Sequence, residues 1–261
     1  MAAPPERIAY GVLPSQFGEL WLPQGAGTAP VVVLIHGGCW QESYGLDLMN
    51  RLAADLRDHG AAVWNIEYRR LGEAGGGFPG SFADTGAAID ALRGLASRFP
   101  LDLGRVVAIG HSAGGQLALW AAARRHLPPG SPVRRENPLP LAGVVTLAGI
   151  NDLAAYAASG PACGGATTIA RLVGGGRSSP YTDTSPRELL PIGVRQVIVS
   201  GGEDGIVPAA FGRDYVAAAQ LAGDHATALT LPGADHFALI DPSSPGWAQL
   251  RPRIADLLGA R

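Results

Sequence analysis

One serine lies between two glycines at the spacing that a hydrolase nucleophile requires, in the segment Gly110-His111-Ser112-Ala113-Gly114. Glycine on both sides allows a sharp turn from strand to helix, which exposes the serine hydroxyl above a sheet. The pattern alone is weak evidence, because a chain with 37 glycines yields roughly 0.3 such matches by chance. Its setting strengthens it, since an apolar run at 105–109 precedes the turn and a helix-like run at 116–124 follows it. Ser112 is therefore the candidate nucleophile for attack on an acyl carbon.

A serine hydroxyl is a poor nucleophile until a nearby base takes its proton. His236 is the best-placed base, because it stands in a turn, Pro232-Gly233-Ala234-Asp235-His236, directly after the strand-like run 227–231. The remaining candidates end predicted helices, precede a strand or neighbour the serine in sequence: His59, His126, His225 and His111. We therefore predict His236 as the general base.

The chain order serine, acid, histidine is typical of hydrolases built on an α/β sheet. The acid is expected after the strand that comes before the strand of His236, and Glu203-Asp204 follows the apolar run 197–199 there. We choose Asp204, because a carboxylate at this point accepts the imidazole N–H and stabilises the imidazolium formed during attack. Glu203 is the alternative, and Asp235 is expected to hold the loop of His236.

A glycine-rich turn follows the long apolar run 31–35 and reads His36-Gly37-Gly38-Cys39-Trp40. Glycine leaves backbone N–H groups accessible to a ligand oxygen, so this turn and the residue after the nucleophile are expected to form an oxyanion hole. The candidate donors are Gly37, Gly38, Cys39 and Ala113. The plainer interpretation is a tight turn between a strand and a loop.

Three further side chains lie near these motifs in the sequence. We expect His36 to brace the glycine-rich turn through hydrogen bonds rather than to act as a base. Trp40 is a candidate to line the acyl pocket, with core filling as its alternative. His111 is a second candidate substrate contact, although it points away from Ser112.

Short apolar runs must form the strands that position these residues. The runs lie at 31–35, 62–66, 106–109, 143–147 and 197–199. The runs are nearly continuous rather than alternating, which indicates strands covered on both faces. Segments with helical periodicity lie between strands at 46–59, 81–99 and 113–126. This alternation predicts an α/β fold with a mostly parallel central sheet and helices on both faces. Residues 8–22 are expected to add one or two antiparallel strands.

The length of 261 residues suits a single domain, 1–261, with a sizeable core. Residues 151–191 interrupt the alternation of strands and helices, because they contain glycine runs, proline and serine. We interpret them as a lid or cap insertion. A second glycine-rich loop at 72–80 is interpreted as a linker, with substrate contact as its alternative. No extended apolar lid helix is visible, so short acyl groups or compact aromatic esters are expected.

Charge and cysteine content disfavour other classes of protein. The formal net charge is −2, and the basic residues are scattered, unlike those of a nucleic-acid binder. The two cysteines, Cys39 and Cys163, form no Cys-x-x-Cys pair, and a single bridge between them remains open. No run approaches the ~20 apolar residues of a membrane span, and residues 1–7 lack the core of a signal peptide. We expect a cytoplasmic protein without metal, organic cofactor, nucleic-acid partner or membrane partner, and the sequence leaves a homodimer open.

Taken together, these motifs resemble the esterase and arylformamidase branch of the α/β-hydrolase superfamily, which includes kynurenine formamidases. The resemblance spans nearly the whole chain and includes Glu67-Tyr68-Arg69-Arg70 and Ser185-Pro186, which are commonly structural in that branch. It implies the α/β-hydrolase fold and an acyl-enzyme formed without metal or cofactor. Lipase-like relatives carry a third glycine at the position of Cys39, and this departure favours Gly38 and Cys39 over Gly37 as donors.

The expected function is that of a serine hydrolase cleaving carboxylic esters through the triad Ser112, His236 and Asp204. One alternative is an arylformamidase acting on N-formylkynurenine-like amides, which the triad cannot distinguish from an esterase. A second alternative is a non-catalytic ligand-binding protein of the same fold. The joint presence of serine, acid, histidine and a glycine-rich turn argues against it. The expected partner is a small-molecule ester or amide substrate.

Overall fold

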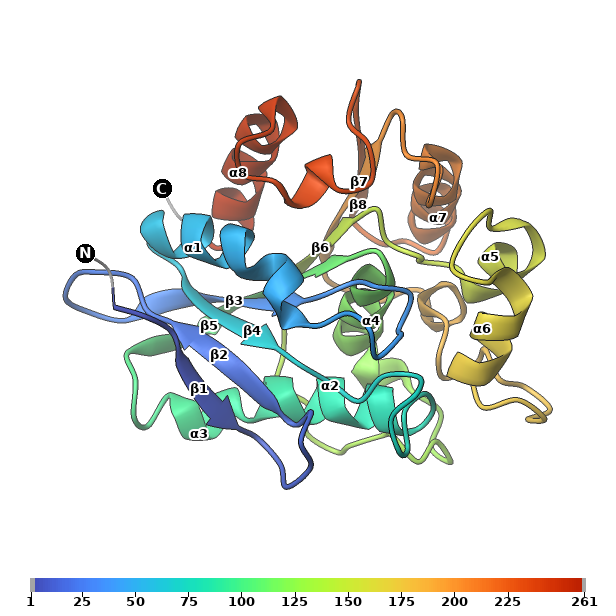
Figure 1. Ribbon diagram of the computed structural model, residues 1–261, viewed down its shortest axis with the longest axis horizontal. Coiled ribbons are helices and arrows are strands. Elements are labelled where there is room, and N and C mark those ends of the chain that lie inside the picture. Colours follow the sequence, from blue (N-terminus) through green and yellow to red (C-terminus); the bar gives the residue numbers. More distant parts are fainter. Residues whose placement is uncertain (1–2, 260–261) are drawn as a thin grey trace.

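An eight-stranded sheet runs through the computed structural model, which describes residues 3–259 (Figure 1). The strands follow the order β1-β2-β4-β3-β5-β6-β7-β8. Their bounds are β1 Glu6–Ala9, β2 Phe17–Trp21, β3 Ala29–Ile35, β4 Ala62–Ile66, β5 Leu101–His111, β6 Gly143–Leu147, β7 Arg195–Gly201 and β8 Ala226–Leu231. Strands β4, β3, β5, β6, β7 and β8 pair parallel, whereas β1 and β2 are antiparallel to their neighbours.

Each apolar run predicted as a strand lies in this sheet, so the predicted α/β class with a mostly parallel sheet is confirmed. Strands β4 and β6 are buried along their whole length, as a continuous apolar pattern requires when helices cover both faces. The antiparallel strands expected within 8–22 are β1 and β2, although β1 begins earlier, at Glu6.

Helices cover both faces of the sheet (Figure 1). Their bounds are α1 Asn50–Asp58, α2 Gly80–Asp90, α3 Leu92–Leu95, α4 Ala113–Ala122, α5 Leu153–Ser159, α6 Gly165–Leu172, α7 Ala209–Leu221 and α8 Pro245–Leu257. Helices α1 and α8 lie side by side on one face, where the indole N–H of Trp247 donates to Asp55 at 2.8 Å. Helices α2 and α4 cover the opposite face. None of the helices in residues 3–259 is long and apolar enough to cross a membrane.

The loops that carry the predicted chemistry meet at one edge of the sheet. Strands β3, β5, β7 and β8 end at Ile35, His111, Gly201 and Leu231, directly before those loops. Because the strands are parallel, their carboxyl ends lie at the same edge, which is where open α/β sheets bind ligands. The topology therefore brings together segments that are up to 200 residues apart in sequence.

The segment 151–191 contains helices α5 and α6 and a 3-10 turn, Pro186–Leu189, with no strand among its residues. These two helices were not predicted, because each is short, with 7 and 8 residues, and glycine-rich turns flank them. Helix α5 begins at an Asp152 cap, whose side chain accepts from Ala155 N at 2.9 Å. The two helices bury apolar side chains on their inner sides: Leu153, Tyr156, Ile169 and Leu172. The lid role of this segment stays a prediction.

The glycine-rich loop 72–80 packs tightly against its own neighbours. A β-carbon on Gly76 would lie 1.8 Å from the carbonyl oxygen of Arg70, and one on Gly80 would lie 1.8 Å from that of Gly75. No side chain fits at such distances, so close backbone contact explains these two glycines. This packing favours the linker interpretation of the loop over substrate contact.

Candidate active site

Ser112 occupies a strained turn between β5 and α4. Its backbone angles are φ 54° and ψ −118°, a region that residues with a side chain rarely adopt. A β-carbon on Gly110 would lie 2.0 Å from the Gly114 oxygen, and one on Gly114 would lie 2.1 Å from the Ile35 oxygen. Both flanking glycines are therefore required by close contacts, as the nucleophile-turn interpretation demands.

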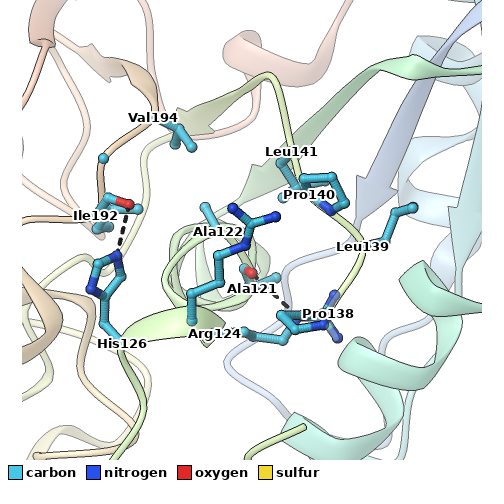
Figure 2. Close-up of a pocket in the computed structure, with 12 residues that line it drawn as sticks. Ala121, Ala122, Arg124, His126, Pro138, Leu139, Pro140, Leu141, Ile192 and Val194 are labelled. Carbon is cyan, nitrogen blue, oxygen red and sulfur yellow. Dashed lines mark hydrogen bonds between the residues drawn. The ribbon is translucent and has the colours of Figure 1, made fainter. Parts of the chain in front are cut away.

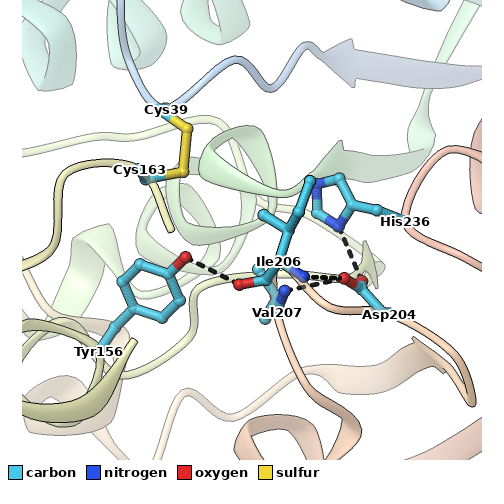
Figure 3. The surroundings of a disulfide bond; sticks show 7 residues. All are labelled: Cys39, Tyr156, Cys163, Asp204, Ile206, Val207 and His236. Atoms are coloured by element: carbon cyan, nitrogen blue, oxygen red, sulfur yellow. Dashed lines mark hydrogen bonds and ion pairs between the residues drawn. A yellow bond between two sulfur atoms is a disulfide. The ribbon is translucent and has the colours of Figure 1, made fainter. Parts of the chain in front are cut away.

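His236 and Asp204 form a buried pair at the same edge of the sheet (Figure 3). The Nδ1–H of His236 donates to Asp204 Oδ2 at 2.7 Å, and the N–H groups of Ile206 and Val207 donate to Asp204 Oδ1 at 2.8 Å each. Burial raises the pKa of Asp204, but the hydrogen bonds from His236, Val207 and Ile206 outweigh it and leave the pKa below its ordinary value. Asp204 is therefore a carboxylate at neutral pH and fixes the His236 tautomer that leaves Nε2 free to accept a proton.

The two alternative acids, Glu203 and Asp235, have different surroundings from Asp204. Glu203 is exposed to solvent, although it is adjacent to Asp204. Asp235 Oδ1 accepts from the N–H groups of Phe237 and Ala238 at 3.0 and 2.8 Å. Asp235 thus holds the turn of His236, as its position in the sequence predicts.

His111 connects the nucleophile turn to the base. It precedes Ser112 directly, and its buried ring lies 4.5 Å from the ring of His236, centroid to centroid. The Nε2–H of His111 donates to the backbone carbonyl of His236 at 3.0 Å. His111 was predicted to contact the substrate, but it is only 1% exposed. In the structure it contacts the candidate base instead.

The glycine-rich turn after β3, residues 36–40, is the predicted oxyanion loop. A β-carbon on Gly37 would lie 3.0 Å from Ser112 Cβ, so the backbone of this loop touches the nucleophile. The loop then takes left-handed φ angles of 101° at Gly38, 53° at Cys39 and 58° at Trp40. Within residues 3–259, no acceptor pairs with the N–H of Gly38 or Cys39. These two donors are free for a ligand oxygen.

A second carboxylate–histidine pair holds the oxyanion loop from behind. His36 Nε2 lies 2.7 Å from Glu67 Oε1, and His36 Nδ1 lies 2.7 Å from the Gly37 carbonyl oxygen, so both ring nitrogens are within hydrogen-bond distance of a neighbour. The His36 ring also stacks on Tyr68 at 4.5 Å, and the Tyr68 hydroxyl donates to the His36 carbonyl at 3.0 Å. Burial raises the pKa of Glu67, but the hydrogen bond from His36 and the charge of Arg70 outweigh it, so its net pKa is lowered. His36 therefore braces the loop, as sequence analysis expected.

Trp40 fills the core instead of lining a substrate pocket. Its side chain is 0% exposed, and its indole N–H donates to Gln116 Oε1 at 3.1 Å. The predicted substrate contact is therefore wrong for this conformation, and the core alternative describes the residue.

Two exposed aromatic side chains beside the site were not predicted. Phe237 is 51% exposed, and its ring meets His236 edge-on at 5.3 Å. Tyr44 is 44% exposed and lies against Gly38, where a β-carbon would come within 2.4 Å of Tyr44 Cγ. The only sequence signal was their proximity to His236 and to the oxyanion loop. These rings give the surroundings of Ser112 two apolar surfaces.

A separate cavity of about 260 Å³ lies at the opposite edge of the sheet, past the carboxyl end of α4 (Figure 2). Two of its polar side chains already have partners. Arg124 forms an ion pair with Asp90 at 2.8 Å, and His126 Nε2 donates to the Ile192 carbonyl at 3.2 Å. None of the candidate catalytic residues lines this cavity, so the chemistry is assigned to the edge that carries Ser112. Among the described residues, no cluster of His, Cys, Asp or Glu could hold a metal ion.

Sequence comparison and structural comparison place the chain among known proteins. The sequence matches the model of the BD-FAE family over residues 19–216. A truncated form of a carbohydrate esterase from gut microbiota has a TM-score of 0.84 at 21% identity, with 99% of this chain and 97% of that chain covered. Esterase B from Lactobacillus rhamnosis (HN001) has a TM-score of 0.84 at 19% identity, covering 98% and 85%. Thermogutta terrifontis esterase 2 phosphonylated by sarin has 0.81 at 18%, covering 98% and 95%. No curated protein matches the sequence.

The buried imidazole of His111 predicts an acid-dependent loss of stability. Burial, followed by the nearby His236, lowers the pKa of His111 from 6.5 to about 3. Between these values the unfolded chain binds a proton that the folded protein does not, so stability falls as pH drops below 6.5. His111→Gln keeps an N–H donor for the His236 carbonyl but does not titrate. Its loss of unfolding free energy between pH 7.5 and pH 5.0 should be smaller than that of wild type by about 2 kcal/mol.

Urea unfolding at the two pH values measures this difference. His225→Gln, at an exposed position before β8, is the matched control and should lose as much stability as wild type. Equal losses for wild type and His111→Gln would show that the imidazole of His111 accepts a proton in the folded state.

Proposed function

Because the chain belongs to the BD-FAE family, we propose that it is a serine hydrolase that cleaves carboxylic esters with Ser112 as nucleophile. The observation that carries the proposal is the Asp204–His236 hydrogen bond of 2.7 Å, held beside the Ser112 turn by His111. The free N–H groups of the oxyanion loop lie against the same turn. These contacts support the proposal that a base, its orienting acid and donors for a developing negative charge act on the Ser112 hydroxyl.

The proposed reaction has two steps. Ser112 Oγ attacks the ester carbonyl carbon while its proton passes to His236 Nε2, and the carbonyl oxygen becomes an oxyanion. The N–H groups of Gly38, Cys39 and Ala113 donate to that oxygen. His236 then protonates the departing alkoxide, and the alcohol leaves an acyl group on Ser112. A water molecule repeats the sequence, with His236 taking its proton, and releases the carboxylic acid.

Asp204 supports both steps by its charge. Its Oδ2 accepts from the Nδ1–H of His236 throughout both steps. The positive charge of the imidazolium formed on proton uptake is therefore balanced by a carboxylate 2.7 Å away. Its lowered pKa keeps this carboxylate ionised at neutral pH. His111 remains neutral there, because its pKa is about 3, and it adds no positive charge that would oppose protonation of His236.

Short acyl esters of a carbohydrate or another compact alcohol are the proposed substrates. Ser112 is 1% exposed, which favours a small acyl group over a long chain. The exposed rings of Phe237 and Tyr44 offer flat apolar surfaces on which a sugar ring or an aromatic group could pack. One solved structure of the same fold is described as a carbohydrate esterase, which supports the same substrate class. The formamide alternative stays a prediction and is an outcome of the substrate test below.

Substitutions at Asp204 and at its neighbour Glu203 test which of the two carboxylates orients His236. Asp204→Asn keeps the volume of the side chain but cannot stabilise the imidazolium or enforce the Nδ1–H tautomer, so kcat should fall by about 10³–10⁴-fold. Glu203→Gln makes the equivalent change at the adjacent exposed position and should leave kcat close to the wild-type value. Steady-state hydrolysis of p-nitrophenyl acetate measures both. A large loss in Glu203→Gln with little loss in Asp204→Asn would reverse the assignment.

A substrate panel tests the proposed reaction itself. We expect kcat/KM to be highest for acetate esters, to fall for hexanoate esters, and to be lower by orders of magnitude for N-formylkynurenine. Ser112→Ala supplies the background and should lose roughly 10⁴-fold or more in kcat. Preference for the formamide over every ester would replace the proposal with the arylformamidase function. Hydrolysis at an unchanged rate in Ser112→Ala would reject Ser112 as nucleophile.

A further inference from the structure

A disulfide joins the oxyanion loop to the segment 151–191. Cys39 and Cys163 are 124 residues apart in sequence, and their Cα atoms lie 5.2 Å apart. Cys39 belongs to the oxyanion loop, whereas Cys163 stands in the turn between α5 and α6 (Figure 3). The bond is therefore a covalent connection between a loop that touches Ser112 and a pair of helices outside the sheet.

Both cysteines stand in turns with unusual backbone geometry. Each turn contains three consecutive residues with left-handed φ angles: 101°, 53° and 58° at Gly38, Cys39 and Trp40, and 56°, 72° and 50° at Cys163, Gly164 and Gly165. A left-handed φ is unfavourable for a residue with a side chain and persists only where the surroundings impose it. The disulfide is a contact that both turns share.

The helix pair also holds the loop of the candidate acid (Figure 3). The hydroxyl of Tyr156 in α5 donates to the carbonyl of Ile206 at 2.9 Å. The N–H of Ile206 in turn donates to Asp204 Oδ1 at 2.8 Å, and Asp204 Oδ2 accepts from His236. Contacts thus continue from α5 through the acid to the base.

The two helices are anchored firmly enough to act as a support. Tyr156, Ile169 and Leu172 are each at most 1% exposed. The N–H of Leu153 donates to Ser185 Oγ at 3.2 Å. The disulfide therefore attaches the oxyanion loop to packed elements rather than to a free loop.

We propose that the Cys39–Cys163 disulfide is a positioning element of the reaction, one that fixes the oxyanion donors relative to the Asp204–His236 pair. This inference rests on the proposed esterase function. Negative charge on the substrate oxygen and positive charge on His236 develop in the same transition state, so the two loops must hold their relative placement. Without the bond, the oxyanion loop loses its covalent connection to α5 and α6, the elements that hold the acid loop through the Tyr156 hydroxyl.

A purely stabilising disulfide would behave differently. Joining distant residues restricts the unfolded chain and raises the melting temperature without altering the turnover of molecules that are already folded. A positioning disulfide acts on the transition state, so its loss lowers kcat for each folded active site with little change in KM. Turnover per active site separates the two roles.

The experiment reduces the wild-type enzyme with dithiothreitol. One thiolate of the reagent attacks a cysteine sulfur and its second thiol closes a ring, so that two electrons convert the disulfide to two cysteine thiols. Complete reduction is verified by counting two thiols per chain, and folding is verified by circular dichroism at the assay temperature. Active sites are counted with a fluorophosphonate. We expect kcat for p-nitrophenyl acetate per counted site to fall about tenfold, with KM changed less than about twofold.

Two variants complete the design. Cys163→Ser removes the bond without touching a proposed oxyanion donor, and it should reproduce the reduced kcat and show no response to dithiothreitol. Thr167→Ala, at an exposed position in α6, keeps the bond and should behave as wild type in both conditions. If Cys163→Ser fails to fold, reduction of the folded wild-type enzyme decides the question.

The outcomes separate this inference from the proposed function. An unchanged kcat per site after complete reduction, with only a lower melting temperature, would overturn the positioning role and leave the esterase function intact. Unfolding of the reduced protein at the assay temperature would also overturn it, since the bond would then be a stabilising one. Failure of the fluorophosphonate to modify Ser112 in the oxidised enzyme would instead reject the proposed function.

Discussion

The close approach of two backbone segments, after β3 and after β5, is the constraint on which the rest of the site depends. A side chain on Gly114 would collide with the Ile35 carbonyl, and one on Gly37 would meet Ser112 Cβ at 3.0 Å. Strands β3 and β5 are neighbours in the sheet, so both turns emerge side by side. This contact places the turn that carries the proposed N–H donors against the serine. The remaining elements then have to supply a base and keep the two turns from moving apart.

Two buried carboxylate–histidine pairs meet these two requirements: one contains the proposed base, and the other braces the oxyanion loop. Asp204 pairs with His236, which is the proposed base, and Glu67 pairs with His36, which braces the oxyanion loop, each at 2.7 Å. In both cases burial alone would favour the neutral carboxylic acid, and hydrogen bonds to the ionised form reverse that preference. The two pairs have similar chemistry and different proposed tasks. Both ring nitrogens of His36 contact oxygens of the protein, whereas Nε2 of His236 is left for the proposed proton transfer from Ser112.

Sequence reasoning located the strands because buried parallel strands leave continuous apolar runs, and β4 and β6 were predicted with their observed bounds. It placed Ser112, Asp204 and His236 at strand ends for the same reason. It missed α5 and α6, which are only 7 and 8 residues long and lie among glycine-rich turns, and it assigned substrate contacts to Trp40 and His111. Those two side chains are buried by tertiary packing, which local spacing does not encode. The Cys39–Cys163 disulfide also depends on tertiary packing, and it is at odds with the predicted cytoplasmic location, because reducing compartments rarely preserve such bonds.

In the proposed reaction, the hydroxyl of Ser112 becomes covalently bonded to the acyl group. A fluorophosphonate tests it most directly, because attack by an activated serine displaces fluoride and leaves a stable phosphonyl group on the oxygen. Intact-mass measurement followed by peptide mapping should find one adduct per chain, located on Ser112, and none in Ser112→Ala. Absence of an adduct on the wild-type protein, or an adduct on a different residue, would reject Ser112 as the nucleophile.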